Sequence, residues 1–502
     1  MNMLNFIKNK YFLVIMGALL LSLSAFGNRT WWTGLFGLTP FFYVLVNNNS
    51  EKPIKSNIGL SLLFGFIFYG ITMIWLWPYG WYAWLGSTVY LSLYMGLFGA
   101  FFHLFVIKGE RKSPISQAFR FFFLVVGVGF LWTCVDWLRG FSFQWYSLFH
   151  LAAYDKPLIQ YISYLGPYFL DFVIASFDMC LVYFIIMKNA KNSINVGITE
   201  EFLANLGVFI FIIMHICSLG FLKSPLLGDY KVSILQGSLD MWEKTDEETF
   251  DTYKSLSDSV KENTDLFIMP ETTFSELHKG DKITRELEKL AKDKKTPIIV
   301  GANTESEKEG LYNSAILISK EGVWQSRQNK IKLVPYGEYV PKILPFKNSM
   351  MREIDAVPGN EIVPLKLAGT DVKIGCAICF DSSFPTFFRK ASKDCNVLAV
   401  ISNDWWFGKH FAPENHYMMS VLRAVENRRY LLRCGSNGIS GIISPEGETI
   451  SKTKLDDVTV LNENFGLIKE RTFYSLYGDW FPLVGMFIWL LIIPPLCFWR
   501  IK

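Results

Sequence analysis

The sequence predicts two kinds of structure in one chain: a multi-span α-helical membrane domain and an α/β domain on the far side of the membrane from the cytoplasm. Hydrophobic residues make up 51% of the 502 residues and charged residues only 19%, which is too apolar for an ordinary soluble protein. The long apolar runs are concentrated in residues 1–225, whereas residues 226–470 alternate strand-like and helix-like segments. One further apolar run lies in residues 471–502.

Eight apolar segments are about long enough to cross a bilayer, for which roughly 20 residues are needed. We therefore expect about seven transmembrane helices before the α/β domain and one after it. The first segment could instead be a signal peptide, but more spans follow at once and no small-residue cleavage site stands out, so we expect an uncleaved span. The candidate spans are approximately 11–27, 30–46, 58–79, 83–107, 119–137, 160–187, 205–223 and 476–498.

The loops that contain Lys and Arg alternate with loops that are poor in them. Such positive loops face the cytoplasm, which predicts that both termini are cytoplasmic and that residues 226–470 are exported. The basic residues that support this orientation are Lys8, Lys10, Lys52, Lys55, Lys108, Arg111, Lys112, Arg120, Lys188, Lys191, Arg500 and Lys502.

Charge and cysteine content narrow the function classes. The formal net charge of +4 is small for this length, so we expect no nucleic-acid partner. Four of the eight cysteines lie in apolar runs, where cysteine usually acts as a small hydrophobic residue. A disulfide framework is therefore not expected.

The exported domain alternates between the two element types, which favours an α/β sandwich over a barrel of hairpins. The predicted strands are 232–235, 266–269, 298–301, 315–319, 372–378, 397–402 and 441–444. The predicted helices are 246–262, 281–293, 384–393 and 415–430.

The most informative of these strands, residues 372–378, ends at Cys379. Hydroxyl residues and Pro385 follow and predict a helix start, where the helix N-terminus favours an anion such as a thiolate. A cysteine at a strand end is more often structural than catalytic, so this stretch alone is a weak signal.

Two other stretches strengthen the signal. The strand 266–269 is followed by Glu271, and Lys330 and Lys332 precede an aromatic, glycine-containing turn. A thiol needs a base to take its proton, and a nearby ammonium group stabilises the thiolate and the oxyanion of an acyl-transfer intermediate. A Glu, a Lys and a Cys in one domain are the set that such chemistry requires.

The motifs around these residues resemble those of the nitrilase superfamily, and in particular its membrane-embedded branch, the apolipoprotein N-acyltransferases. The resemblance covers the exported domain by motif and the flanking spans by layout. The motifs are Pro270-Glu271, Lys330 with Leu333-Val334-Pro335-Tyr336-Gly337-Glu338, Ile378-Cys379-Phe380-Asp381, Asn403-Asp404-Trp405-Trp406-Phe407-Gly408, and His416 with Arg423, Ala424, Glu426 and Arg429.

The resemblance implies a nitrilase-like αββα sandwich and a role for each matching residue. Cys379 matches the nucleophile, Glu271 the general base and Lys330 the catalytic lysine, with Lys332 a rival that the motif spacing disfavours. Glu338 matches an auxiliary acid. Further auxiliary or substrate-binding candidates are Tyr336, Phe380, Asp381, Trp405, Trp406 and Trp242.

The chain departs from the family pattern in two places. Family members usually carry Tyr-Glu after the cysteine, where this chain has Phe380 and Asp381; the shorter Asp keeps the charge but has less reach. A family tryptophan is expected close to Thr245, whereas this chain has Trp242.

Several of these features have a plainer interpretation. The run from His416 to Arg429 is more simply a helix with one charged, solvated face. Cys376 and Cys379 form a C-x-x-C, but they lie along a strand and no second such pair appears, so a redox or zinc site is disfavoured. The apolar segment 336–351 is either a buried loop or a lid that touches the bilayer.

The resemblance implies transfer of an acyl chain from a phospholipid, through a cysteine thioester, to the α-amino group of a diacylglyceryl-modified apolipoprotein in a bacterial inner membrane, with the catalytic domain in the periplasm. No metal or organic cofactor is expected, and the protein is expected to be a monomer. One alternative is a membrane-tethered amidohydrolase that acts on a small amide. Another is a non-enzymatic transporter or scaffold. A proton-coupled transporter normally uses charged residues inside its spans, and these spans contain few, such as Asp136 and Asp171.

Overall fold

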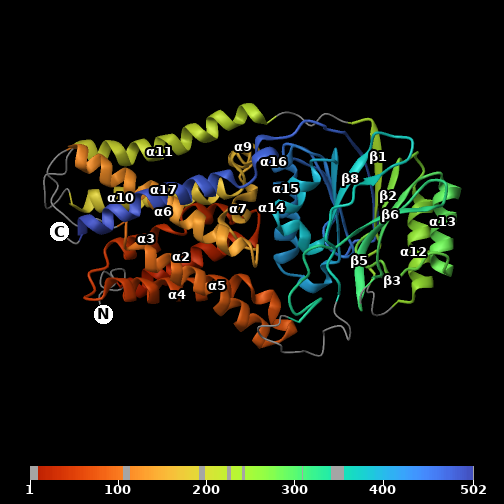
Figure 1. The fold of residues 1–502 in the computed structure, drawn as a ribbon, viewed down its shortest axis with the longest axis horizontal. Helices are drawn as coiled ribbons and strands as arrows, with labels where there is room; N and C mark the ends of the chain where they lie inside the picture. The colour runs from red at the N-terminus through yellow and green to blue at the C-terminus, as the bar shows by residue number, and fades with distance from the viewer. Residues whose placement is uncertain are drawn as a thin grey trace. The chain divides into compact units, whose positions relative to one another are not determined.

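The computed structural model describes residues 9–105, 114–190, 198–222, 228–239, 244–307, 309–340 and 356–500. The chain divides into two compact units (Figure 1). The first, helical unit comprises Met1–Leu222 and Asp479–Lys502, and the second, α/β unit comprises Lys223–Gly478.

The helical unit contains long helices connected by short helical turns. Its longer helices are α2 (Lys10–Leu23), α3 (Thr39–Val46), α4 (Pro53–Thr72), α5 (Trp81–Phe102), α6 (Pro114–Gly140), α10 (Tyr168–Ala190), α11 (Ile198–Ser218) and α17 (Trp480–Arg500). Its one-turn helices are α7 (Leu148–Leu151), α8 (Lys156–Ile159) and α9 (Ile162–Leu165).

Every predicted span overlaps an apolar helix in the described residues, which confirms a helical membrane domain. Four of these helices are long and apolar enough to cross a membrane: Pro53–Thr72, Trp81–Phe102, Phe121–Gly140 and Tyr168–Lys188. Four are shorter within the described part of the chain: Lys10–Phe26, Trp31–Val46, Asn205–Phe221 and Trp480–Leu491.

Two of the predicted spans run past a helix break, which hydropathy does not detect. The span predicted from residue 160 begins at Tyr168, since Gly166 has a φ of 79° and is followed by Pro167. The span predicted to reach residue 79 ends as an α-helix at Thr72 and continues as a 3₁₀ segment that contains Pro78.

Arg139 and Asp136, in the last turn of α6, form a buried ion pair. The Arg139 guanidinium donates to the Asp136 carboxylate at 2.8 Å and to the carbonyls of Phe143 and Trp145 at 3.0 and 2.6 Å. A charge at membrane depth is costly unless it has partners. This pair therefore fixes the turn that follows α6.

The α/β unit contains two sheets. One has the order β13-β1-β2-β4-β5-β6, with β3 paired to β4, and the other has the order β12-β11-β10-β9-β8-β7. The strands of the first sheet are β1 (Tyr230–Gln236), β2 (Leu266–Ile268), β3 (Phe274–Glu276), β4 (Ile298–Glu305), β5 (Leu311–Ile318), β6 (Trp324–Asn329) and β13 (Thr459–Phe465). Those of the second are β7 (Leu365–Lys366), β8 (Lys373–Ile378), β9 (Val397–Ser402), β10 (Leu431–Gly435), β11 (Gly441–Ile443) and β12 (Thr449–Lys452).

Helices cover the outer face of each sheet, which gives the predicted αββα sandwich (Figure 1). Helices α12 (Asp246–Ser259) and α13 (Lys282–Lys294) pack on the first sheet through an apolar core. Helix α14 (Pro385–Ala391) packs against β8, and α15 (Ala412–Asn427) against β10. A second core of buried, mostly aliphatic residues fills the space between the sheets.

The seven predicted strands are all present, but six others are not predicted by the sequence. β6 and β13 are mostly polar and partly exposed, because each lies at one end of its sheet and needs no apolar pattern on both faces. β10 is apolar but begins four residues after α15 ends, so its first residues resemble a continuation of that helix.

Candidate active site

The predicted catalytic residues follow the ends of strands that belong to different sheets. Glu271 comes shortly after β2 and Lys330 directly after β6 in one sheet, and Cys379 directly after β8 in the other. Asn403 directly follows β9, which is parallel to β8. Parallel strands bring their carboxyl ends to one edge, where sites in α/β domains collect.

Lys330 lies between two carboxylates. Its Nζ atom is 3.0 Å from Oε1 of Glu271 and 2.9 Å from Oε1 of Glu338, and its side chain is 2% exposed. Burial alone would lower the pKa of Lys330, but the two carboxylates outweigh burial and hold the pKa above its ordinary value. Lys330 is thus a fixed positive charge, whereas Lys332 is exposed and places its ammonium 5.0 Å from the centre of the Phe384 ring.

Both oxygens of Glu271 accept hydrogen bonds. Oε1 accepts from Lys330 and, at 2.7 Å, from the side-chain amide of Asn313; Oε2 accepts from the backbone N–H of Asn403 at 2.8 Å. Asn313 also donates to Glu338 at 3.2 Å. Three hydrogen-bond donors therefore hold the Glu271 carboxylate in place.

Sequence reasoning did not identify Asn313 as a site residue. It lies in β5, where it is 1% exposed and bridges the two carboxylates that flank Lys330. The signal in the sequence is an Asn next to an apolar run, within one strand. A buried amide needs polar partners, so an Asn there indicates a polar cluster.

Cys379 is buried and has an unusual backbone. Its φ is 46°, a left-handed conformation that costs a non-glycine residue about 1–3 kcal/mol and is common at functional sites. Burial raises the pKa of the Cys379 thiol, the charge of Glu271 raises it further, and Lys330 partly opposes them. The resting residue is therefore a thiol that must lose its proton to attack.

The turn after Lys330 holds Glu338. Its Oε2 accepts from the backbone N–H of Val334 at 2.9 Å. Burial would raise the pKa of Glu338, but Lys330 and this N–H lower it below the ordinary value. Tyr336, with a φ of 61°, closes the turn by donating its N–H to the carbonyl of Tyr339 at 2.8 Å.

Asp381 is a buried acid that accepts hydrogen bonds from backbone N–H groups. Its carboxylate accepts from the N–H groups of Ile331 at 3.2 Å and Lys332 at 2.6 Å. It therefore ties the segment after Lys330 to the turn that carries Cys379. Burial raises the pKa of Asp381 to about 7, although these N–H groups oppose the rise.

The aromatic candidates lie in different surroundings. Phe380 is buried and packs edge-to-face on Phe384 with the ring centres 5.1 Å apart. Trp405 is 38% exposed, and its indole N–H donates to the carbonyl of Leu239 at 3.0 Å. Trp406 lies next to it in the 3₁₀ turn Asp404–Phe407, partly buried. Trp242 and positions 341–355 lie outside the described residues.

The interpretation of the run from His416 to Arg429 as a solvated face is wrong. His416, Arg423, Glu426 and Arg429 are all fully buried. Helix α15 is buried along its length. Arg423 donates to Glu426 at 2.7 Å and to the carbonyl of Ser383 at 3.2 Å. A charged helix pattern does not show whether the charges meet water or each other.

The C-x-x-C pair shows no sign of a shared site. Cys376 is fully buried in the core between the sheets, and it and Cys379 are both free cysteines. Within the described ranges, no group of three or more His, Cys, Asp or Glu side chains is arranged to hold a metal ion.

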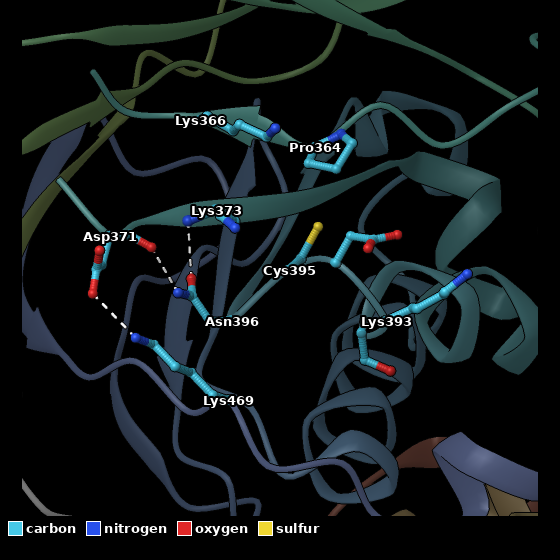
Figure 2. A pocket seen from close by; sticks show the side chains of 10 residues that line it. Pro364, Lys366, Asp371, Lys373, Lys393, Cys395, Asn396 and Lys469 are labelled. Carbon is cyan, nitrogen blue, oxygen red and sulfur yellow. Dashed lines mark hydrogen bonds and ion pairs between the residues drawn. The ribbon is translucent and has the colours of Figure 1, made fainter. Parts of the chain in front are cut away.

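A surface pocket of about 440 Å³ opens at the other end of β8 (Figure 2). Lys373, the first residue of β8, and Lys366 line it, together with the ion pair between Lys469 and Asp371, 3.1 Å apart. Cys379 follows the opposite end of this strand. The pocket is therefore separate from the cluster around Lys330.

Comparison with known proteins gives matches to both units. Residues 231–462 match the carbon-nitrogen hydrolase family, and residues 17–180 match the apolipoprotein N-acyltransferase N-terminal domain. Two similar relatives are both named apolipoprotein N-acyltransferase. The protein of Rickettsia typhi is 29% identical over 380 residues, 72% of this chain and 74% of that protein. The protein of Geobacter metallireducens is 33% identical over 446 residues, 84% of this chain and 82% of that protein. On these matches, the chain belongs to the apolipoprotein N-acyltransferase family.

Proposed function

We propose that this protein transfers an acyl chain from a phospholipid to the α-amino group of the lipidated N-terminal cysteine of an apolipoprotein, through a thioester on Cys379. The observation that carries the proposal is the buried ammonium of Lys330 between Glu271 and Glu338, within electrostatic reach of the Cys379 thiol. Family membership and the apolar helices of the first unit favour lipid substrates.

In the first step, Glu271 takes the thiol proton as Sγ of Cys379 attacks the carbonyl carbon of the phospholipid ester. The new C–S bond forms, and the C–O bond to the glycerol breaks. Glu271 then returns the proton to the leaving alkoxide, which departs as the alcohol of a lysophospholipid. The enzyme is left as a thioester.

In the second step, the α-amino group of the apolipoprotein attacks the thioester carbonyl. The C–N bond forms as the C–S bond breaks. Glu271 removes a proton from the attacking nitrogen and gives it to the departing thiolate, so the thiol of Cys379 is regenerated. One carboxylate thus serves as base and acid in both halves of the cycle.

Lys330 acts through its charge. Because its pKa is raised, it remains an ammonium throughout and does not serve as the base. A fixed cation at this place stabilises the negative charge that develops on the substrate carbonyl oxygen. Glu338, with a lowered pKa, remains charged and holds Lys330 in place from the other side.

The same three residues could hydrolyse a small amide, but this alternative is not favoured. The match of residues 17–180 is to the N-terminal domain of apolipoprotein N-acyltransferases, and the four long apolar helices are unnecessary for a soluble amide. We further propose that the α/β unit lies in the periplasm and that both termini are cytoplasmic, since loops rich in Lys and Arg face the cytoplasm.

The discharge of the acyl-enzyme distinguishes transferase from hydrolase. Purified protein, preloaded with acyl groups from phospholipid vesicles, is mixed either with a diacylglyceryl-modified Cys peptide or with the same peptide acetylated at its α-amino group. We expect the free-amine peptide to remove the acyl group and gain its mass, and the acetylated peptide to leave the acyl-enzyme intact. Equal loss with both peptides, with fatty acid released to water, would indicate a hydrolase.

A further inference from the structure

The backbone of Cys379 needs support from its surroundings. A φ of 46° in a residue with a side chain persists only where neighbouring groups hold it. Hydrogen bonds to the Cys379 carbonyl can hold this conformation, because the carbonyl belongs to the peptide unit that follows the strained φ. Its contacts come from two side chains that no step of the proposed reaction uses.

The first contact is local and the second comes from α15. The hydroxyl of Ser382 donates to the Cys379 carbonyl at 2.6 Å. Nε2 of His416 lies 3.3 Å from the same carbonyl and 2.9 Å from the Ser382 hydroxyl. The Cys379 carbonyl, the Ser382 hydroxyl and the His416 imidazole therefore form one hydrogen-bonded group.

The other ring nitrogen of His416 is anchored to an ion pair. Nδ1 is 2.9 Å from Oδ1 of Asp404 and 3.0 Å from Nη2 of Arg433. Nη2 of Arg433 also donates to Oδ2 of Asp404 at 2.9 Å. All three side chains are completely buried, so the orientation of the ring is fixed from the side away from Cys379.

The charges in this cluster balance. The charge of Arg433 holds the pKa of Asp404 well below its usual range, against the effect of burial. Burial and the charge of Arg433 lower the pKa of His416, which leaves the imidazole neutral. A neutral imidazole carries one N–H. When that proton is on Nε2, the ring donates to the Cys379 carbonyl, and Nδ1 accepts from Nη2 of Arg433.

We propose that His416 is a positioning residue of the acyl transfer: anchored by Arg433, which Asp404 holds in turn, it donates to the Cys379 carbonyl and thereby fixes the left-handed backbone from which the thiol projects. The proposal rests on the proposed role of Cys379 as the nucleophile. The plainer explanation is that the cluster only stabilises the fold, so the test must separate reactivity from stability.

Two amide substitutions divide the contacts of His416. In His416→Gln the side-chain nitrogen reaches about as far as Nε2, so the contact with Cys379 can persist while that with Arg433 is lost. In His416→Asn the amide reaches approximately the place of Nδ1, so the contact with Cys379 is lost while that with Arg433 can persist. The matched control is Tyr417→Phe, which removes one buried hydrogen bond from the same helix, to Thr449 at 3.0 Å.

The readout is the rate at which iodoacetamide alkylates Cys379 in the full-length protein in detergent, mapped by mass spectrometry to that residue, with the melting temperature measured in parallel. The thiolate displaces iodide as the S–C bond forms, and no lipid is involved. We expect alkylation to slow about tenfold in His416→Asn and less than about threefold in His416→Gln, the effect of one hydrogen bond, with Tyr417→Phe like the wild type.

Equal slowing in both amide variants, or comparable slowing in Tyr417→Phe, would overturn the proposal. If His416→Asn does not fold, Ser382→Ala tests the same carbonyl: slower alkylation at an unchanged melting temperature supports the proposal, and an unchanged rate overturns it. Acylation of the same samples by phospholipid vesicles tests the proposed function separately, because alkylation requires only a positioned thiol.

Discussion

The carboxylate of Glu271 accepts the backbone N–H of Asn403 at 2.8 Å. Glu271 follows a strand of one sheet and Asn403 a strand of the other, so this bond joins the two sheets at the proposed site. It holds the base in register with the sheet that carries Cys379. Both halves of the sandwich are therefore needed to assemble the site.

Glu271 has two separable effects on Cys379. Its negative charge raises the pKa of the thiol, and its carboxylate is the proposed base. In Glu271→Gln we expect the pH midpoint of Cys379 alkylation to fall, because the repelling charge is gone, while acyl transfer falls by about 10²–10⁴. Alkylation is followed by mass spectrometry and transfer by peptide acylation.

Glu276→Gln is the control for this pair of effects, because Glu276 is partly exposed and pairs with His278 at 2.9 Å. It should change neither quantity. A higher alkylation midpoint in Glu271→Gln would contradict the electrostatic relationship between Glu271 and Cys379.

Lys330 is expected to support stability as well as catalysis. Lys330→Met leaves the buried carboxylates of Glu271 and Glu338 without their counter-ion, a change that typically costs roughly 3–5 kcal/mol. We expect a lower melting temperature of the full-length protein and loss of acylation. Lys332→Met removes an exposed lysine two residues away and should leave both near the wild-type values; a similar loss there would show that the choice between the two lysines is wrong.

Asn313 is expected to matter because its amide donates to two charged acceptors. Hydrogen bonds to charged groups contribute about 1.5–3 kcal/mol each. Asn313→Ala should therefore slow acyl-enzyme formation by about tenfold or more, measured by rapid quench and intact mass.

Asn303→Ala provides the comparison for Asn313. Asn303 is the cross-strand partner of Asn313 and is nearly buried, but its amide donates to the Ser275 carbonyl at 2.6 Å. If the two variants slow acylation equally, the loss comes from disturbance of the strand pair and not from the carboxylates.

The raised pKa of Asp381 predicts how stability depends on pH. With a folded pKa of about 7 and an unfolded value of about 3.9, the folded state binds more protons between these values, so this residue's contribution to stability falls as pH rises from about 4 to 7. Asp381→Asn removes this pH-dependent contribution to stability. Its melting temperature relative to the wild type should therefore increase from pH 5 to pH 8.

For Asp381, the suitable control is Asp371→Asn, because Asp371 is exposed and pairs with an exposed lysine, Lys469. The melting temperature of this variant relative to the wild type should not change with pH. A difference for Asp381→Asn that is flat across pH 5–8 would mean that the buried carboxyl is ionised throughout this range.

The sequence predicts the strands that precede Glu271 and Cys379 because residues 266–269 are a continuous apolar run and residues 374–378 a run of apolar and small residues. It predicts Lys330 through its motif, although the strand before it, β6, is polar and shows no apolar pattern. Strands of this kind depend on pairing with a neighbour, which local composition does not encode.

The network around His416 could not be predicted in the same way. Its members come from the 3₁₀ turn after β9, from α15 and from β10. They meet only when the second sheet and its covering helix are packed. In a single sequence, a buried and balanced set of charges has the same composition as a solvated face. The sequence likewise does not show why an Asp can stand at position 381, where relatives usually carry the longer Glu. The structure explains it, since the partners of Asp381 are backbone N–H groups close by.

The most direct test of the central claim is the intact mass of the protein after exposure to phospholipid vesicles without acceptor, for wild type and Cys379→Ala. We predict that the wild type gains the mass of one acyl chain, that the gain maps to Cys379 and is released by hydroxylamine, and that the alanine variant gains none. An equal acyl gain in both proteins, or no gain in a folded wild type that still acylates peptide, would contradict a Cys379 thioester.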